Sequence, residues 1–214
     1  VYKMELGGRD FWTGLITLQW SLLTDLGDTP SARAGHSMIS FSNHSGVIFG
    51  GYDGTTYLND TYQMVVSSAN ATWTLFTNTG DTPYGRNAFS MVELGDGTIV
   101  VFGGKGIDGS FNDMYQVELS DTSAYWTQLT NFGDTPTARG GHMMMVLDDG
   151  SAVLFGGDNG SSCFNDMYQL WRPTDSPTAA PTASPTASPT SAPTASPTSA
   201  PTAAPTASPT AAPT

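Results

Sequence analysis

Short runs of apolar residues, some alternating with polar ones, recur along the first 172 residues. Gly, Asp and Asn lie between the runs, as turns require, and no stretch has a helical period with caps. Four strands fit each unit of the pattern, at 36–41, 47–49, 61–66 and 72–77 in the first full copy. The chain is therefore predicted to be all-β.

The pattern repeats every 53 residues without an insertion. A Gly-Asp-Thr-Pro segment occurs at 27–30, 80–83 and 133–136. The other shared positions are Trp20, Trp73 and Trp126; Arg33, Arg86 and Arg139; the glycine pairs Gly50 and Gly51, Gly103 and Gly104, Gly156 and Gly157; the Asn-Asp pairs at 59–60, 112–113 and 165–166; and Tyr62, Tyr115 and Tyr168. Three copies in one register indicate a repeat protein.

A repeated antiparallel sheet of four strands is the blade of a β-propeller. The predicted blades span 27–79, 80–132 and 133–171, and residues 1–26 form part of a preceding blade. Rings close with four to eight blades, so about three blades leave this one incomplete. We expect further blades of a longer chain, or self-association, to close it. A strand around 17–23 could complete the last blade.

The shared residues also carry a resemblance to a known family. An apolar strand ends in Gly-Gly, a Tyr follows a loop, and a Trp stands eleven residues beyond it, which resembles the kelch repeat. The resemblance covers nearly all of residues 1–172 and implies a partial kelch-type propeller that binds a partner through loops on one face. Blade 2 has Phe89 at the position where the other repeats have His36 and His142. This histidine is therefore not expected to act as a chemical group common to the blades.

The loops between the second and third strands of each unit, called here the B–C loops, differ most between repeats. Antiparallel geometry places them on one face with the D–A loops, which join consecutive units. Positions that differ are free for recognition, whereas the shared positions listed above maintain the blade. The candidate contact residues are Tyr52, Asp53, Tyr57, Tyr84, Arg86, Lys105, Ile107, Asp108, Asp158 and Asn159.

Charge and composition narrow the function classes. With 19 acidic and 7 basic residues, the chain lacks the basic face that nucleic acid needs. Its single Cys cannot form a disulfide scaffold. We expect the three repeated arginines to pair within the scaffold, with Asp28, Asp81 and Asp134 as the proposed partners.

The sequence shows no catalytic set, metal site or cofactor motif. A metal between His36 and His142 is conceivable, but packed histidines are favoured because they recur at one repeat position. The acidic B–C loops lack the oxygen ligands of a calcium site. A galactose-oxidase-like enzyme is therefore the least favoured hypothesis.

A tetrapeptide of Pro, Thr and two small residues repeats through 173–214. Such a segment cannot bury an apolar core, so we expect a disordered stalk or linker. This composition resembles O-glycosylated stalks, and the sequons at Asn43, Asn59, Asn70 and Asn159 favour N-glycosylation and the secretory route. The leading hypothesis is a secreted or cell-surface kelch module that binds a protein or glycan. The alternative is a cytoplasmic kelch adaptor or scaffold.

Overall fold

The structure is a computed structural model that describes residues 2–9 and 16–171. Its strands are β1 (Tyr2–Arg9), β2 (Ile16–Leu22), β3 (Thr24–Gly27), β4 (Ser37–Ser40), β5 (Ser45–Tyr52), β6 (Tyr57–Val66), β7 (Asn70–Gly80), β8 (Ser90–Glu93), β9 (Ile99–Gly106), β10 (Gly109–Leu119), β11 (Ser123–Leu129), β12 (Met143–Val146), β13 (Ala152–Phe155) and β14 (Met167–Leu170). A single 3-10 turn, η1 (Ser42–His44), is the helical element of the described residues. None of their helices has the length and apolar character that crossing a bilayer demands. The all-β prediction is confirmed, and the predicted tail lies outside the described residues.

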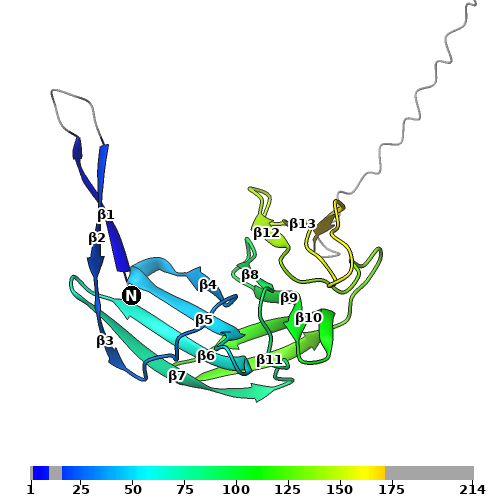
Figure 1. The fold of residues 1–214 in the computed structure, drawn as a ribbon, viewed down its shortest axis with the longest axis horizontal. Coiled ribbons are helices and arrows are strands. Elements are labelled where there is room, and N and C mark those ends of the chain that lie inside the picture. Colours follow the sequence, from blue (N-terminus) through cyan, green and yellow to red (C-terminus); the bar gives the residue numbers. More distant parts are fainter. Residues whose placement is uncertain (1, 10–15, 172–214) are drawn as a thin grey trace, which may run out of the picture. The chain divides into compact units, whose positions relative to one another are not determined.

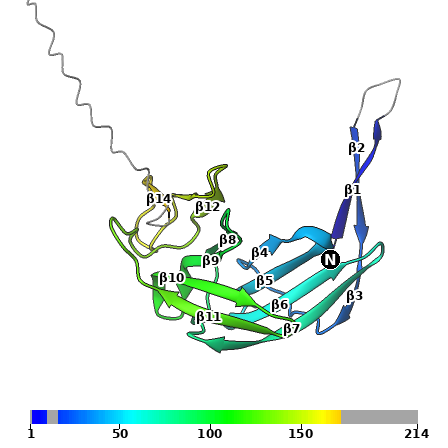
Figure 2. The same cartoon turned by 180° about the vertical axis from the view of Figure 1, so that it is seen from behind.

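Antiparallel pairing follows the predicted blade order (Figure 1). Blade 1 is β4-β5-β6-β7, blade 2 is β8-β9-β10-β11, and blade 3 is β12-β13-β14. Three of the four predicted strands of blade 1 are longer in the structure, since β5 spans Ser45–Tyr52, β6 begins at Tyr57 and β7 continues to Gly80, whereas β4 is shorter than its predicted range. Figure 2 shows β14 in blade 3, the last strand of the described chain. The hairpin β1–β2 pairs Met4 with Trp20, as expected for the third and fourth strands of a preceding blade.

Neighbouring blades also share a parallel strand pair that the sequence pattern did not reveal. The end of β7 (77–80) lies beside the start of β11 (123–126), and the two views agree on this placement. In the preceding repeat, β3 pairs in the same way with the start of β7. This pairing joins blades 1 and 2 into one nine-stranded sheet.

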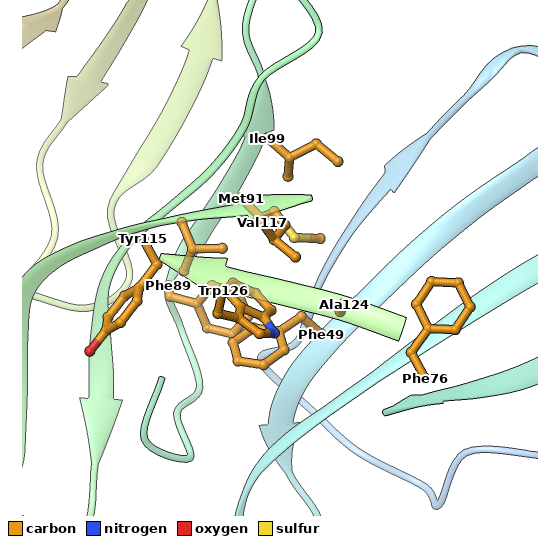
Figure 3. Close-up of a cluster of buried hydrophobic side chains, with 10 residues drawn as sticks. Phe49, Phe76, Phe89, Met91, Ile99, Tyr115, Val117, Ala124 and Trp126 are labelled. Carbon is orange, nitrogen blue, oxygen red and sulfur yellow. The ribbon is translucent and has the colours of Figure 1, made fainter. Parts of the chain in front are cut away.

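Large apolar side chains fill the space between blades 1 and 2 (Figure 3). The Phe49 ring is completely buried, and its centroid lies 4.5 Å from that of Trp126 and 5.4 Å from that of Phe89. Trp126 is 1% exposed. Trp73, its equivalent in blade 1, is buried as well, at 6% exposure.

Each blade has a leading flank, which faces the preceding blade, and a trailing flank, which faces the next. Equivalent residues differ in exposure where a neighbour is lacking: Phe49 and Phe102 are buried on trailing flanks, whereas Phe155 of blade 3 is 52% exposed. Trp20 is 65% exposed, so the described residues do not give it the packed position of its counterparts. Burial of these ring positions therefore depends on the adjacent blade.

Candidate interaction face

The B–C and D–A loops of each blade are tied together by a reciprocal pair of backbone hydrogen bonds. The bonded residues are Ala34 with Tyr52, Asn87 with Lys105, and Gly140 with Asp158, at distances of 2.8–2.9 Å. The two loop types therefore form one surface, here called the loop face, as the sequence predicted.

The glycine pairs let the next blade's D–A loop approach this surface closely. A Cβ atom on Gly103, which has φ +63°, would lie 2.8 Å from the carbonyl oxygen of Arg139 in the following blade. Gly104 has φ +101°, and a Cβ atom there would lie 2.8 Å from the carbonyl oxygen of Asn87 in its own blade. Its N–H donates to the Arg139 carbonyl of the following blade at 2.8 Å, and Gly51 donates likewise to Arg86. A side chain at Gly104 would be both strained and crowded. These contacts explain why the glycines recur in every unit.

Each repeated arginine forms a two-point contact with the aspartate of the Asn-Asp pair in its own blade. The Arg86 guanidinium donates to the two carboxylate oxygens of Asp113 at 2.6 and 2.9 Å, and to the Gly103 carbonyl at 2.9 Å. Arg33 and Arg139 make the same contacts with Asp60 and Asp166.

The predicted pairing with the Gly-Asp-Thr-Pro aspartates is therefore wrong. Asp28 and Asp81 instead accept a backbone N–H from the fourth strand of the same repeat unit, donated by Leu75 and Gln128, at 3.2 Å. Both aspartate series recur with the arginines, so spacing alone did not distinguish them. Scaffold pairing itself, the more general expectation, agrees with the structure.

Arg86 does not belong among the contact residues. Its side chain is 0% exposed, and its remaining Nε donates to the Tyr84 carbonyl at 3.0 Å. The guanidinium carbon also lies 4.5 Å from the centroid of the Phe111 ring, a stacked partner that sequence reasoning missed. Phe164 occupies the same position under Arg139. The phenylalanine shared by these two repeats was the sequence signal that could have indicated the stacked partner.

Tyr52, Asp53 and Tyr57 shape the B–C loop of blade 1. The two tyrosine rings lie 4.9 Å apart between centroids, and the Tyr52 hydroxyl donates to the Gly54 carbonyl at 2.9 Å. Backbone N–H groups of Thr56 and Thr55 donate to Asp53 and lower the pKa of its carboxyl. Asp53 therefore remains a solvent-exposed anion whose turn is already ordered.

Lys105 and Asp158 link the B–C loops of blades 2 and 3. The Lys105 ammonium donates to the Asp158 carboxylate at 2.6 Å, and this contact is the main cause of the lowered pKa of Asp158. Asn159 accepts the N–H groups of Ser161 and Ser162 at 3.0 and 2.9 Å. The polar atoms named here therefore hold the loops in place while remaining accessible.

Tyr84 and Ile107 are the most exposed large side chains of the predicted set, at 76% and 87%. Tyr84 follows Pro83 in the D–A loop of blade 2, and Ile107 is at the tip of its B–C loop. Asp108 beside Ile107 is exposed as well. The loop face thus offers two apolar contact points from fixed loops, and the B–C loops also carry Asp53, Asp108 and Asp158.

His142 is buried between blades and not on this surface. Its ring centroid lies 5.5 Å from that of Phe102, in the edge-on geometry that Phe89 makes with Phe49. Burial, and then the charge of Arg139, lower the pKa of His142 to about 4. His36, its equivalent in blade 1, is exposed. Within 2–9 and 16–171, no group of three or more His, Cys, Asp or Glu residues is placed to hold a metal ion.

Comparison with known proteins gives a family and several relatives. The model of the KLHDC2/KLHL20/DRC7 Kelch-repeats domain matches residues 9–197. The chain is 33% identical over 173 residues to tip elongation aberrant protein 1 of Schizosaccharomyces pombe, covering 75% of this chain and 14% of that protein. It is 31% identical over 183 residues to the Arabidopsis thaliana F-box/kelch-repeat protein At1g51550, covering 77% of this chain and 37% of that protein.

A third relative is acyl-CoA-binding domain-containing protein 5 of Arabidopsis thaliana, 30% identical over 143 residues that make up 66% of this chain and 21% of that protein. The chain thus spans between 14% and 37% of these three relatives. The family match over most of the chain's length shows that the chain belongs to the kelch-repeat family.

Proposed function

We propose that the loop face binds a protein partner and that Tyr84 and Ile107 are its principal contacts. The observation that carries this proposal is the pair of exposed apolar side chains on loops that backbone bonds already order. Exposed aromatic and aliphatic residues on rigid loops bind with little loss of conformational entropy. Kelch domains are typically protein-interaction modules, which supports this reading.

The charge around these side chains defines the partner chemistry. Asp53 and Asp108 are exposed anions, whereas Asp158 forms an ion pair with Lys105. An acidic rim favours a partner with lysine or arginine around an apolar centre, because opposite charges speed association and exclude acidic surfaces. Binding should therefore weaken as the salt concentration rises.

Affinity capture with matched variants tests this assignment. We expect a partner retained by the wild-type chain to be lost with Tyr84→Ala and with Ile107→Ala. Tyr125→Ala removes an aromatic ring that is 53% exposed on β11, away from the loop face, and should retain it. Equal retention by all four proteins would contradict the proposal. It includes no catalytic step, so stoichiometric copper or iron in the purified protein would also argue against it.

We also propose that the module is displayed outside the cell on its Pro/Thr-rich segment. The composition of 173–214 and the exposed sequon residues Asn43 and Asn159 support this placement. Mass spectrometry of the native protein before and after deglycosylation tests it. Added sugar is expected, and a mass equal to the polypeptide alone would favour a cytoplasmic adaptor.

A further inference from the structure

We propose that Asn159 loses its side-chain amide through attack by the Gly160 nitrogen, so that a carboxylate replaces the amide at the tip of the B–C loop of blade 3. The site lies within this one loop and does not depend on what the loop face binds. Asn159 is the one asparagine of the sequence that glycine follows directly. Both residues are exposed, so water reaches them.

Gly160 leaves its nitrogen open to the neighbouring side chain. It has φ +89°, a region that favours glycine, and a Cβ atom there would have no heavy atom beyond its chain neighbours within 4 Å. A residue with a side chain would be strained in this conformation and would crowd the Asn159 amide. The tip of the loop therefore has the space in which a succinimide ring closes between these two residues.

Hydrogen bonds of the loop reach both groups that react. Oδ1 of Asn159 accepts the N–H groups of Ser161 and Ser162 at 3.0 and 2.9 Å. These two donors stabilise the negative charge that Oδ1 gains when its carbon is attacked. The N–H of Gly160 donates to Oδ1 of Asp158 at 2.8 Å. This carboxylate is therefore in place to accept the proton that the nitrogen loses.

The reaction balances with water as its co-reactant. The Gly160 nitrogen forms a bond to Cγ of Asn159 while its proton passes to Asp158. The bond between Cγ and Nδ2 then breaks, and Nδ2 leaves as ammonia with the proton returned from Asp158. Water opens the succinimide at Cγ to give an aspartate. When water opens it at the backbone carbonyl, an isoaspartate forms, whose main chain runs through Cβ.

Blade 1 shows that an aspartate fits this loop. Asp53 occupies the repeat position of Asn159, and its Oδ1 accepts the N–H groups of Thr55 and Thr56 at 2.8 and 2.7 Å. Gly54 follows with φ +100° and the same open space. The backbone N–H of Asp53 donates to the Thr56 carbonyl at 3.3 Å, and the equivalent bond of Asn159 measures 3.2 Å. The aspartate product therefore keeps the turn, because its carboxylate accepts the same two N–H groups.

The isoaspartate product does not fit the turn. It adds a carbon to the main chain between Asp158 and Gly160 and converts the bonded Oδ1 into a backbone carbonyl oxygen. The two serine N–H groups then lose their side-chain acceptor. Both products place a further negative charge next to the ion pair of Asp158 with Lys105, so the reaction makes the loop face more acidic.

Ageing of the 214-residue chain at neutral pH tests the proposal. The chain is produced without N-linked sugar, because a sugar on Nδ2 of Asn159 blocks the leaving group. We expect an acidic species to accumulate on ion exchange, and peptide mass spectrometry to show the replacement of NH2 by OH at residue 159. Asn43, which is exposed but followed by His44, should show little loss. Isomerisation of Asp-Gly pairs leaves the mass unchanged and is thereby distinguished.

Two variants of Asn159 are matched controls. Asn159→Gln keeps an amide on a longer side chain that closes this ring poorly, so the acidic species should be absent. Asn159→Asp should elute with the aged wild-type species that retains the turn. It should also unfold at the same denaturant concentration as the fresh wild type, as Asp53 predicts. An acidic species formed equally by the wild type and Asn159→Gln would overturn the proposal.

Two further variants test the role of Asp158 through opposite effects. Asp158→Asn keeps an oxygen for the Gly160 N–H but takes up no proton, and should slow the loss about tenfold, less than in an enclosed active site because water also reaches this loop. Lys105→Met removes the contact that lowers the pKa of Asp158, and should speed the loss. A looser loop alone would change both rates in the same direction. That result, or two unchanged rates, would remove Asp158 from the reaction.

Discussion

At the scale of single residues, burial decides what an ion pair contributes. The Arg86–Asp113 and Lys105–Asp158 contacts have the same 2.6 Å length. The Arg86 side chain is fully buried, whereas both partners of the other pair are about one-third exposed. Solvent screens the second pair and leaves only the first as a structural requirement.

Replacing each cation by methionine should reveal this difference. Arg86→Met leaves the Asp113 carboxylate and the Gly103 carbonyl without their donor, and should lower the free energy of unfolding by about 3 kcal/mol. Lys105→Met should lower it by less than about 1 kcal/mol. Guanidinium unfolding monitored by circular dichroism measures both. Equal losses would show that burial does not determine how much each ion pair contributes to the free energy of unfolding.

His142 makes stability depend on pH. Its pKa is about 4 in the folded chain, below the 6.5 of an exposed histidine, because burial disfavours the charged ring. The unfolded chain therefore binds the proton first as pH falls. This group's contribution is complete above pH 6.5 and is lost between pH 6.5 and about 4, by at most about 1.4 kcal/mol per pH unit.

Phenylalanine at this position, the residue that blade 2 has as Phe89, should preserve the packing and remove the titration. We expect His142→Phe to flatten the unfolding free energy between pH 6.5 and 4. His36→Phe should change this slope less, because His36 is exposed. An unaltered slope in His142→Phe would assign the pH dependence to another group.

At the scale of elements, the extension of each fourth strand connects one blade to the next. Asn78 lies in this extension of β7. Its Oδ1 accepts from Thr61 and Trp126, and its Nδ2 donates to the Asn59 carbonyl. One side chain therefore bonds the third strand of its own blade and the fourth strand of the following blade.

Asn78→Ala should lower the free energy of unfolding by about 2–4 kcal/mol, because two buried donors lose their acceptor. Thr79→Ala is the adjacent control, since its hydroxyl makes only a 3.5 Å contact with the Ala124 carbonyl. Its effect should be within about 0.5 kcal/mol. Chemical denaturation compares the two, and similar values would mean that Asn78 is not the connecting residue.

The repeat made the strands and their order predictable, but not every contact between them. Turn residues and apolar runs located blades 1 to 3, and the variable loops located the loop face. Parallel pairing of β3 with β7 escaped notice because it joins segments 46 residues apart with no pattern of their own. Arg86 was placed on the loop face because its position in the chain is there, whereas its side chain points inward to Asp113.

At the scale of the whole repeat domain, equivalent residues of different blades contribute differently to stability. Phe49 is enclosed by blade 2, whereas Phe155 lies on the open trailing flank. Stability in such arrays comes from each unit and from its contacts with neighbours. The contribution of a repeated position therefore depends on whether a neighbouring blade covers it.

Phe49→Ala should lower the unfolding free energy by about 3–5 kcal/mol, because the ring is fully buried. Phe155→Ala should lower it by less than about 1 kcal/mol, because this side chain is 52% exposed. Chemical denaturation monitored by circular dichroism compares the two variants. Equal losses would contradict the dependence of this position on a covering blade.

The arginine–aspartate contact also has a practical consequence. Because each blade closes this contact beneath its own B–C loop, the loop tip is not needed to hold the strands together. Segments between the glycine pair and the following aromatic residue should therefore be exchangeable between blades, or replaceable by foreign peptides, while the underlying sheet persists. The domain would then serve as a scaffold whose binding specificity can be changed by replacing one loop at a time.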